Sequence, residues 1–304
     1  MAGETLMQTL PLAPANTLGQ VLTAALIAVA AIVFVPLIGG LLAGLDRKLT
    51  ARLQSRIGPP LAQPFYDVIK LLSKSLIVTT RAQVVFTWAY LLFTLTALVL
   101  FVLGQDLLLI VFVLGFGGLC FIAAGFSTKS PYAIIGAQRE IAQMLAYEPV
   151  LILSAVAAYL VNGGFAVSLI VASPQPLLPK LPLIFLALLV ALLVKLRKSP
   201  FDFAASQHAH QELIRGILTE FSGPYLAMIE ITHWIESVIV LAMIGLFWAS
   251  SPLIGLLLAA GAFVFAIFVD NISARLTWSW MLKSSWSLGV GLSALNIALL
   301  KLWA

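Results

Sequence analysis

Long apolar runs separated by short polar connections make up most of this sequence. A helix needs roughly 17 to 25 apolar residues to cross the hydrocarbon core of a bilayer, and runs of that kind occur near 18–44, 83–103, 107–126, 141–161, 181–197, 225–248, 253–270 and 286–303. The connections at 104–106 and 249–252 are very short, so the runs on either side of each are expected to be antiparallel neighbours. The pattern predicts an all-α integral membrane protein with about eight transmembrane helices.

Composition agrees with this pattern. Hydrophobic residues make up 62% of the chain and charged residues 10%, against about 25% charged residues in a typical soluble domain, and the mean hydropathy is +1.08. The first 17 residues lack the basic start of a secretory signal, so the first run is expected to be a retained span. Without an internal repeat or a low-complexity segment, residues 1–304 are expected to form a single polytopic membrane domain.

Basic residues fall on alternate connections. The segments near 45–81, 127–139, 195–215 and 271–285 hold 15 of the 17 Lys and Arg, and the other side keeps only Lys180 and Lys301. The positive-inside rule then places the first set in the cytoplasm and both termini outside it, as expected for a multi-pass protein of the cell membrane. Because this bias follows topology and forms no basic patch with interleaved aromatic residues, the net charge of +5 does not indicate nucleic-acid binding.

The connection after the first run has two parts. Basic residues recur at helical spacing until Gly-Pro-Pro at 58–60 ends the helix. They are Arg47, Lys48, Arg52 and Arg56. Near 64–74 apolar residues recur at i, i+3, i+4 and i+7 while Asp67 and Lys70 face elsewhere, a pattern typical of an amphipathic helix in the membrane interface. Such a helix could anchor lipid headgroups or dock a partner.

Carboxylic acids lie within or beside the predicted spans, where an unpaired acid costs roughly 2.5 to 3.5 kcal/mol on insertion scales. Glu140 and Glu148 are eight residues apart, which puts them about 12 Å apart along a helix and ~80° around it, on one broad face. A second series enters the sixth span and consists of Glu212, Glu220, Glu230, His233 and Glu236. These acids could relay protons. Alternatively, Glu148 and Glu220 could form static ion pairs with Arg139, Arg215 or Lys195.

One cysteine, Cys120, lies inside the third run. A lone thiol cannot form an intramolecular disulfide or a cysteine-ligated zinc or iron–sulfur site. No cofactor is therefore expected in this chain, and any redox metal must lie in a partner.

Three sequence blocks resemble one family. They are "DRKLTARLQSRIGPP" with "YDVIKLLSK", then "AQREIAQMLAYEPV", then "SPFDF" with "HQELIRGILTEFSG". In this order they resemble subunit 1 of respiratory complex I and its homologues in membrane-bound hydrogenases, and the likeness covers roughly residues 20–303. The resemblance implies that Glu148, Glu212 and Glu220 belong to an inner acidic chain linking a redox arm to proton-pumping subunits. We assign the proton relay to Glu140, Glu148, Glu212, Glu220 and Glu230, supported by Arg139, Asp202, His208, His210 and His233.

One block departs from the complex I pattern. Complex I members carry Pro-Glu-Gly-Glu-Ser-Glu after Pro-Phe-Asp, beside the quinone chamber, whereas this chain reads "PFDFAASQHAHQEL", with Ala204 and Ala205 at the start of the acidic run. Lys195 also stands where the family usually has Glu. The chain is therefore most similar to the membrane subunit of Ech-type energy-converting NiFe hydrogenases, which pass electrons from ferredoxin to protons.

The polar residues of that block have more than one interpretation. His208 and His210 could load protons into the relay, lie on the surface, or contact a docked subunit, and two histidines without a third ligand do not indicate a metal site. Asp202 could be a turn residue or part of a partner interface.

Three functional hypotheses follow. The first is a non-redox membrane anchor and ion-coupling subunit of a NiFe hydrogenase, linking ferredoxin-dependent proton reduction to proton or sodium translocation. Its expected partners are the hydrogenase large and small subunits and ferredoxin-like subunits on the cytoplasmic side, which would carry the NiFe centre and iron–sulfur clusters, an antiporter-like membrane subunit, and the lipid bilayer. Loops 45–81 and 195–222 are expected to dock the peripheral arm.

The second hypothesis is the quinone-chamber subunit of an NADH:quinone-type oxidoreductase. The third, a stand-alone ion transporter, lacks the expected inverted repeat and paired interrupted helices.

Overall fold

The computed structural model describes residues 18–202, 204 and 215–303. Within this part of the chain, seven helices are long and apolar enough to cross a membrane, and one further apolar helix, Pro182–Lys195, is shorter. These helices correspond to the eight apolar runs of the sequence. The prediction of an all-α, multi-pass membrane protein is confirmed.

The described residues form long helices joined by short helical elements. The long elements are α1 (Leu18–Leu53), α3 (Arg81–Val102), α4 (Leu107–Ser127), α5 (Pro131–Asn162), α7 (Pro182–Lys195), α8 (Gly223–Gly245) and α9 (Pro252–Ile272). The last span combines α10 (Trp278–Ser284), the π-helical turn η3 (Ser285–Val290) and α11 (Gly291–Trp303). The short elements are α2 (Gln63–Leu72), α6 (Val167–Ala172), η1 (Gly216–Leu218) and η2 (Leu246–Trp248).

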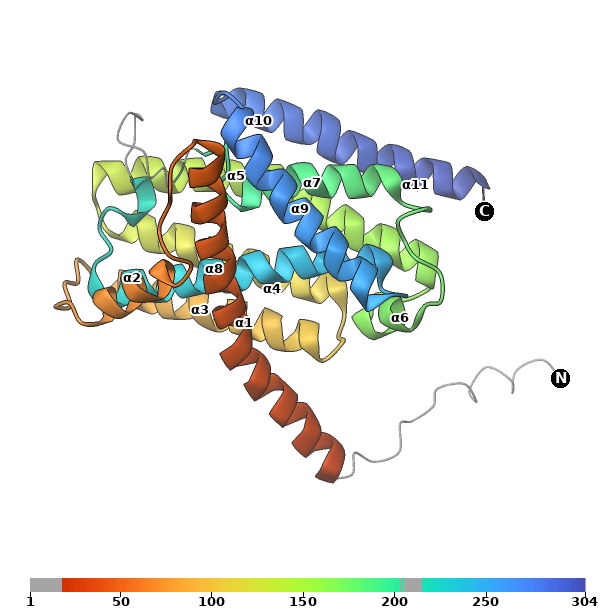
Figure 1. Cartoon of the computed structure of the whole chain (residues 1–304), viewed down its shortest axis with the longest axis horizontal. Helices are drawn as coiled ribbons and strands as arrows, with labels where there is room; N and C mark the ends of the chain where they lie inside the picture. Colours follow the sequence, from red (N-terminus) through yellow and green to blue (C-terminus); the bar gives the residue numbers. More distant parts are fainter. Residues whose placement is uncertain (1–17, 203, 205–214, 304) are drawn as a thin grey trace.

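Most spans lie side by side, while α1 and α9 cross the bundle obliquely (Figure 1). The very short connections do join packed neighbours, α3 with α4 and α8 with α9, as the sequence predicts. The first turn is tight because Gly104 adopts a positive φ of 72° and the carboxylate of Asp106 accepts hydrogen bonds from the backbone N–H groups of Leu108 and Leu109. Such a cap satisfies donors that the helix start leaves free.

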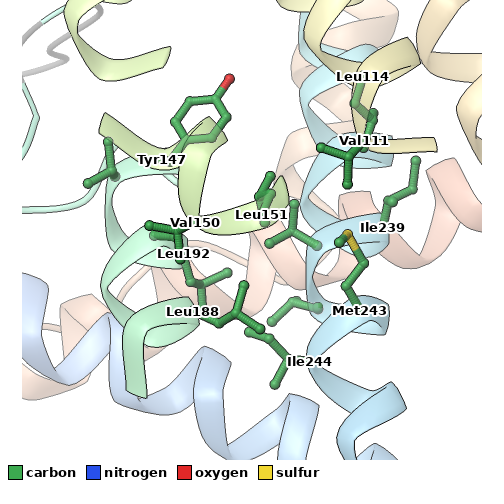
Figure 2. Packing of buried hydrophobic residues seen from close by; sticks show 14 of the residues in the cluster. Val111, Leu114, Tyr147, Val150, Leu151, Leu188, Leu192, Ile239, Met243 and Ile244 are labelled. Atoms are coloured by element: carbon green, nitrogen blue, oxygen red, sulfur yellow. The ribbon is translucent and has the colours of Figure 1, made fainter. Parts of the chain in front are cut away.

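The apolar core lies where α4, α5, α7 and α8 meet (Figure 2). Its labelled members are Val111, Leu114, Tyr147, Val150, Leu151, Leu188, Leu192, Ile239, Met243 and Ile244. Lipid tails are as apolar as these side chains, so close packing rather than the hydrophobic effect must hold the spans together. The phenol of Tyr147 lies at the edge of this cluster with its hydroxyl pointing away from the aliphatic side chains.

The amphipathic helix expected near 64–74 is α2, and its apolar face is divided. Phe65 and Val68 pack toward Trp234 of α8, and the Phe65 and Trp234 rings meet edge-on with centroids 5.5 Å apart. Ile69 and Leu72 remain exposed on the outer side. The helix is thus fixed to the bundle through part of its apolar face, and the exposed part remains available to lipid or a partner.

Candidate functional site

A charged cavity of about 250 Å³ lies where the C-terminal parts of α1, α7 and α9 meet the middle of α8. Its lining includes the acids Asp46, Asp202, Glu230, Glu236 and Asp270. It also includes the bases Arg47, Lys195, Arg197 and Lys198, together with His233. Charged groups in a bundle interior need partners because their desolvation is costly, and the cavity supplies partners of both signs.

Residues 195–198 provide three of the bases and direct them to different helices. Arg197 adopts a positive φ of 52° just after α7 ends. Its guanidinium donates to both carboxylate oxygens of Glu140 on α5, at 2.6 and 3.3 Å, and lies 3.0 Å from His233 Nε2 on α8. Both partners of the Arg197–Glu140 pair are largely buried. This two-pronged contact is a bidentate, charge-assisted pair, which fixes the geometry of both side chains.

Lys195 forms the second buried pair. Its ammonium lies 3.1 Å from Glu236 Oε2, and the two side chains are only 10% and 5% exposed. It also donates to the Tyr147 hydroxyl at 3.2 Å. The other carboxylate oxygen, Glu236 Oε1, has no hydrogen-bond partner among the described residues. The pair is therefore charge-balanced but not fully satisfied.

Lys198 links the ends of two spans that are distant in sequence. Its ammonium contacts both oxygens of Asp46 at 2.7 and 2.6 Å and one oxygen of Asp270 at 3.1 Å. The backbone N–H of Ser199 donates to the other Asp270 oxygen at 2.8 Å. Burial alone would lower the pKa of Lys198, but the two carboxylates raise it above its ordinary value.

Asp202 and Asp67 bind basic residues nearer the surface. Asp202 accepts a hydrogen bond from Arg275 at 2.9 Å, which ties the segment after α7 to the connection before α10. Asp67 on α2 accepts from Arg47 at 2.6 Å and from Gln63 at 3.0 Å. Burial would raise the pKa of Asp67, but these hydrogen bonds and the charges of Arg47 and Lys70 lower it below its ordinary value.

The structure gathers only part of the predicted relay. Glu230, His233 and Glu236 line one cavity, as their spacing by threes predicts. Glu148 lies elsewhere, in a pocket of about 320 Å³ that is lined mainly by apolar residues of α4 and α5. Glu220 lies before α8 and outside the cavity lining, and its backbone carbonyl accepts from Gln83 Nε2 at 3.0 Å. Glu212, His208 and His210 lie outside the described residues.

The ion-pair alternative named the wrong partner for Lys195. The sequence suggested Glu148 or Glu220, whereas the structure pairs Lys195 with Glu236. Arg139, one of the supporting residues, is partly buried on α5 and does not line the cavity. Of the predicted docking residues, Arg52, Arg56 and Lys70 are exposed. Lys48 is partly buried, and Arg47 is engaged with Asp67.

Sequence reasoning missed several residues of the cavity. They are Asp46, Arg197, Lys198 and Asp270. Two signals were available: "KLRK" at 195–198 places three bases in four residues at the end of an apolar run, and Asp46 and Asp270 are acids at the ends of two other runs. Spacing could not pair them, because Lys198 is separated from Asp46 by 152 residues and from Asp270 by 72.

A family model described as NADH dehydrogenase matches residues 25–301. The chain belongs to this family. Among its relatives, an NADH-quinone oxidoreductase subunit of Syntrophotalea carbinolica is 28% identical over 85% of this chain and 89% of its own length. Hydrogenase-4 component C of Escherichia coli is 33% identical over 62% of this chain and 64% of its own length.

A solved structure agrees with this assignment to the NADH dehydrogenase family. A chain in the membrane-bound sulfane sulfur reductase, an archaeal respiratory membrane complex, superposes with a TM-score of 0.80 and 27% sequence identity. The match covers 91% of this chain and 99% of that one. The resemblance to complex I subunit 1 is thus confirmed at the level of family and fold.

Proposed function

We propose that this chain is a membrane subunit of a multisubunit oxidoreductase complex, and specifically the non-redox anchor and ion-coupling subunit of an energy-converting NiFe hydrogenase. Ferredoxin-dependent proton reduction would take place in a cytoplasmic arm whose large, small and ferredoxin-like subunits carry the NiFe centre and iron–sulfur clusters. An antiporter-like subunit would adjoin this chain in the membrane. Family membership and the relative named hydrogenase-4 component C support the proposal.

The charged lining of the cavity is the observation that favours an ion-coupling function. Nine of its fifteen lining residues are charged, whereas sites for organic ligands are lined mainly by apolar and aromatic side chains. Lys195, Arg197 and Lys198 balance the acids of the cavity and its surroundings, and the block that follows them lacks the quinone-type acidic run of complex I. Such a cavity suits the passage of protons or sodium ions better than the binding of a quinone.

Ion passage would use the acids that are free to change their charge. Glu140 is held by Arg197 and would serve as a fixed anion. Glu230 and Glu236 face the cavity, and Glu148 would receive the proton on the side of α4 and α5. Glu220 stands at the entry to α8, where it would pass protons inward from the cytoplasmic loop.

The test separates electron turnover from ion transport. Glu220→Gln and Glu148→Gln keep the size and hydrogen-bonding capacity of each side chain but remove its titration. In inverted vesicles, each variant should retain ferredoxin-linked hydrogen production in the presence of an uncoupler and should lose most of its ion gradient. A general acid or base typically contributes about a hundredfold or more to a proton-transfer rate, so the loss should be large.

A matched control is available at the opposite end of the bundle. Asp106→Asn also neutralises an acid, yet asparagine caps a helix as well as aspartate does, so this variant should build the parental gradient. If Glu220→Gln and Glu148→Gln also build it at the parental rate, these two acids are not part of an ion path.

The second candidate is the quinone-chamber subunit of an NADH:quinone-type oxidoreductase. The NADH-quinone oxidoreductase relative from Syntrophotalea carbinolica favours it, because the match extends over 85% of this chain. Inhibition of electron transfer by quinone-site inhibitors in the purified complex would support this function, whereas a hydrogenase coupled to ferredoxin should be insensitive to them.

A further inference from the structure

Lys195 lies between two acids that occupy separate pockets. Its ammonium is paired with Glu236, which lines the charged cavity. It also contacts Tyr147, the residue directly before Glu148, through a hydrogen bond of 3.2 Å and a position 4.9 Å from the centre of the ring. One flexible cation thus connects the cavity with the segment that carries Glu148.

The glycines of α4 show how close the second acid lies. A Cβ atom at Gly118 would lie 3.7 Å from the Tyr147 hydroxyl oxygen, and one at Gly115 would collide with Glu148 Oε1. Residues three apart on a helix differ by about 4.5 Å in height, so the hydroxyl and the carboxylate contact neighbouring turns of one helix. Lys195 also acts electrostatically on Glu148. The four-carbon side chain of Lys195 is flexible, so its ammonium can change direction by rotation.

Lys195 is the charged partner of Glu236, and Tyr90 also forms a side-chain hydrogen bond with Glu236. The Glu236 side chain is 5% exposed and Oε1 has no partner among the described residues. The other ionisable groups around this pair are Tyr90 of α3, Tyr147 and Glu140 of α5, Arg197 and His233. Arg197 is committed to Glu140 and His233. Lys195 is therefore the cation that can stabilise an ionised Glu236.

We propose that Lys195 is a switching residue that pairs alternately with Glu236 and Glu148 and so passes charge from the cavity to the pocket between α4 and α5. The proposal rests on the ion-coupling function and deepens it. Lys195 remains an ammonium in both positions, because a cation beside a carboxylate favours the ionised form of both groups. Tyr147 guides the movement by accepting a hydrogen bond from the ammonium along the way.

Each movement takes up one proton and releases one. In the proposed cycle, Glu236 is the ionised acid while Lys195 is paired with it, and Glu148, in its mainly apolar pocket, then holds the proton. When Lys195 moves to Glu148, that carboxyl loses its proton to the side of α4 and α5. Glu236, now buried without its cation, takes a proton from the cavity. No oxidant or reductant is required, and the reverse movement resets both acids.

The central test compares four variants of the assembled complex in inverted vesicles. Lys195→Gln should lower the number of ions moved per electron at least tenfold while turnover with uncoupler continues, and Lys195→Arg should restore part of it. The exchanged pair Lys195→Glu with Glu236→Lys keeps opposite charges together but fixes the cation to α8, away from Glu148. It should assemble like the parent and still fail to pump. Lys301→Arg, a conservative change of an exposed lysine outside the cavity, is the control and should pump normally.

The outcomes separate switching from a static ion pair. A static pair predicts that the exchanged pair restores both assembly and pumping, and this result would overturn the proposal. The pH profile of ion transport provides a second readout: it should change shape in Lys195→Arg if the cation controls proton release, and a structural link would leave it unmoved. A Lys195→Gln variant that pumps at the parental ratio would also refute the proposal.

Failure of the broader function has a different signature. If the parental complex builds no gradient with any electron donor that sustains turnover, the ion-coupling function itself is wrong. If the parent pumps and all Lys195 variants pump equally well, ion coupling stands and only the switch is refuted.

Discussion

Lys198 shows how a single side chain can hold a membrane bundle together at one end. It binds Asp46 in the C-terminal part of α1 and Asp270 near the end of α9, and all three side chains are largely withdrawn from solvent. Two carboxylates so placed would repel each other without the cation. Because the pKa of Lys198 is raised in the folded state, its contribution to stability is fully present below its ordinary pKa of about 10.4 and is lost only as the pH rises through the higher folded value.

Replacement of this lysine should destabilise the bundle strongly. Lys198→Met removes the charge and leaves two buried acids unpaired, for which a cost of about 3–5 kcal/mol is typical. We expect a lower denaturation temperature of the detergent-purified complex. Lys48→Met, at the same end of α1 but without an ion pair to any described residue, is the matched control and should have little effect. Equal denaturation temperatures for the two variants would show that the Lys198 contacts contribute nothing to stability.

The sequence predicted which residues share a helix face better than it predicted which residues pair between helices. The spacing of Glu230, His233 and Glu236 placed them correctly on one face, because residues of one helix share a fixed geometry. The partners Glu140 and Arg197 are 57 residues apart and meet only through the packing of α5 against the segment after α7. No periodicity within a helix carries that information, so sequence reasoning named Glu140 and missed Arg197, the base that is paired with it.

At the scale of elements, glycines determine how closely helices approach. Gly136 on α5 faces the backbone of η1, where a Cβ atom would overlap the backbone nitrogen of Ile217 and lie 2.7 Å from the carbonyl carbon of Gly216. Gly216 itself has a positive φ of 39°. This contact holds the end of the loop that follows α7 against α5, close to the charged cavity.

An added methyl group at this junction should therefore be costly. Gly136→Ala forces apart two backbones rather than a flexible side chain, and overpacking of this kind typically costs about 1–3 kcal/mol. Gly261→Ala on α9 meets nothing within 4 Å, so it should be neutral or slightly stabilising, because alanine is the better helix former. Denaturation temperatures of the two purified variants provide the comparison. Destabilisation of both to the same extent would contradict the role of close approach.

The elements themselves were largely predictable. Apolar runs long enough to span a bilayer identified every long helix, and the tight turns identified neighbours, because both follow from local hydrogen bonding and hydropathy. The oblique path of α1 and α9 (Figure 1) was not predictable. Tilt depends on packing between helices rather than on the composition of either one.

At the scale of the whole molecule, polar connections and ion pairs lie together at one end of the bundle. This end contains the C-terminal part of α1, helix α2 and the segment that follows α7. Arg52 lies in the last turn of α1 and is exposed. Arg56, just beyond the helix, donates a hydrogen bond to the side-chain oxygen of Gln54. The amide nitrogen of Gln54 donates to Asn271, near the end of α9, at 3.0 Å. The surface carries exposed positive charge and lies beside the cavity through which ions are proposed to pass.

This surface should dock the peripheral arm. Electrostatic complementarity sets partner choice and association rate at interfaces, so Arg52→Glu with Arg56→Glu should release the arm from the membrane while the spans still insert. The double change Lys180→Glu with Lys301→Glu alters the charge equally at the opposite end and should leave the complex intact. Co-purification of the soluble subunits with the membrane chain, measured at low and at physiological salt, checks both variants. Full retention of the arm by the Arg52 and Arg56 variant would exclude this surface as the docking site. A loss shared by both double variants would instead indicate a general effect of charge on insertion, which protease accessibility of the loops in intact membranes can detect.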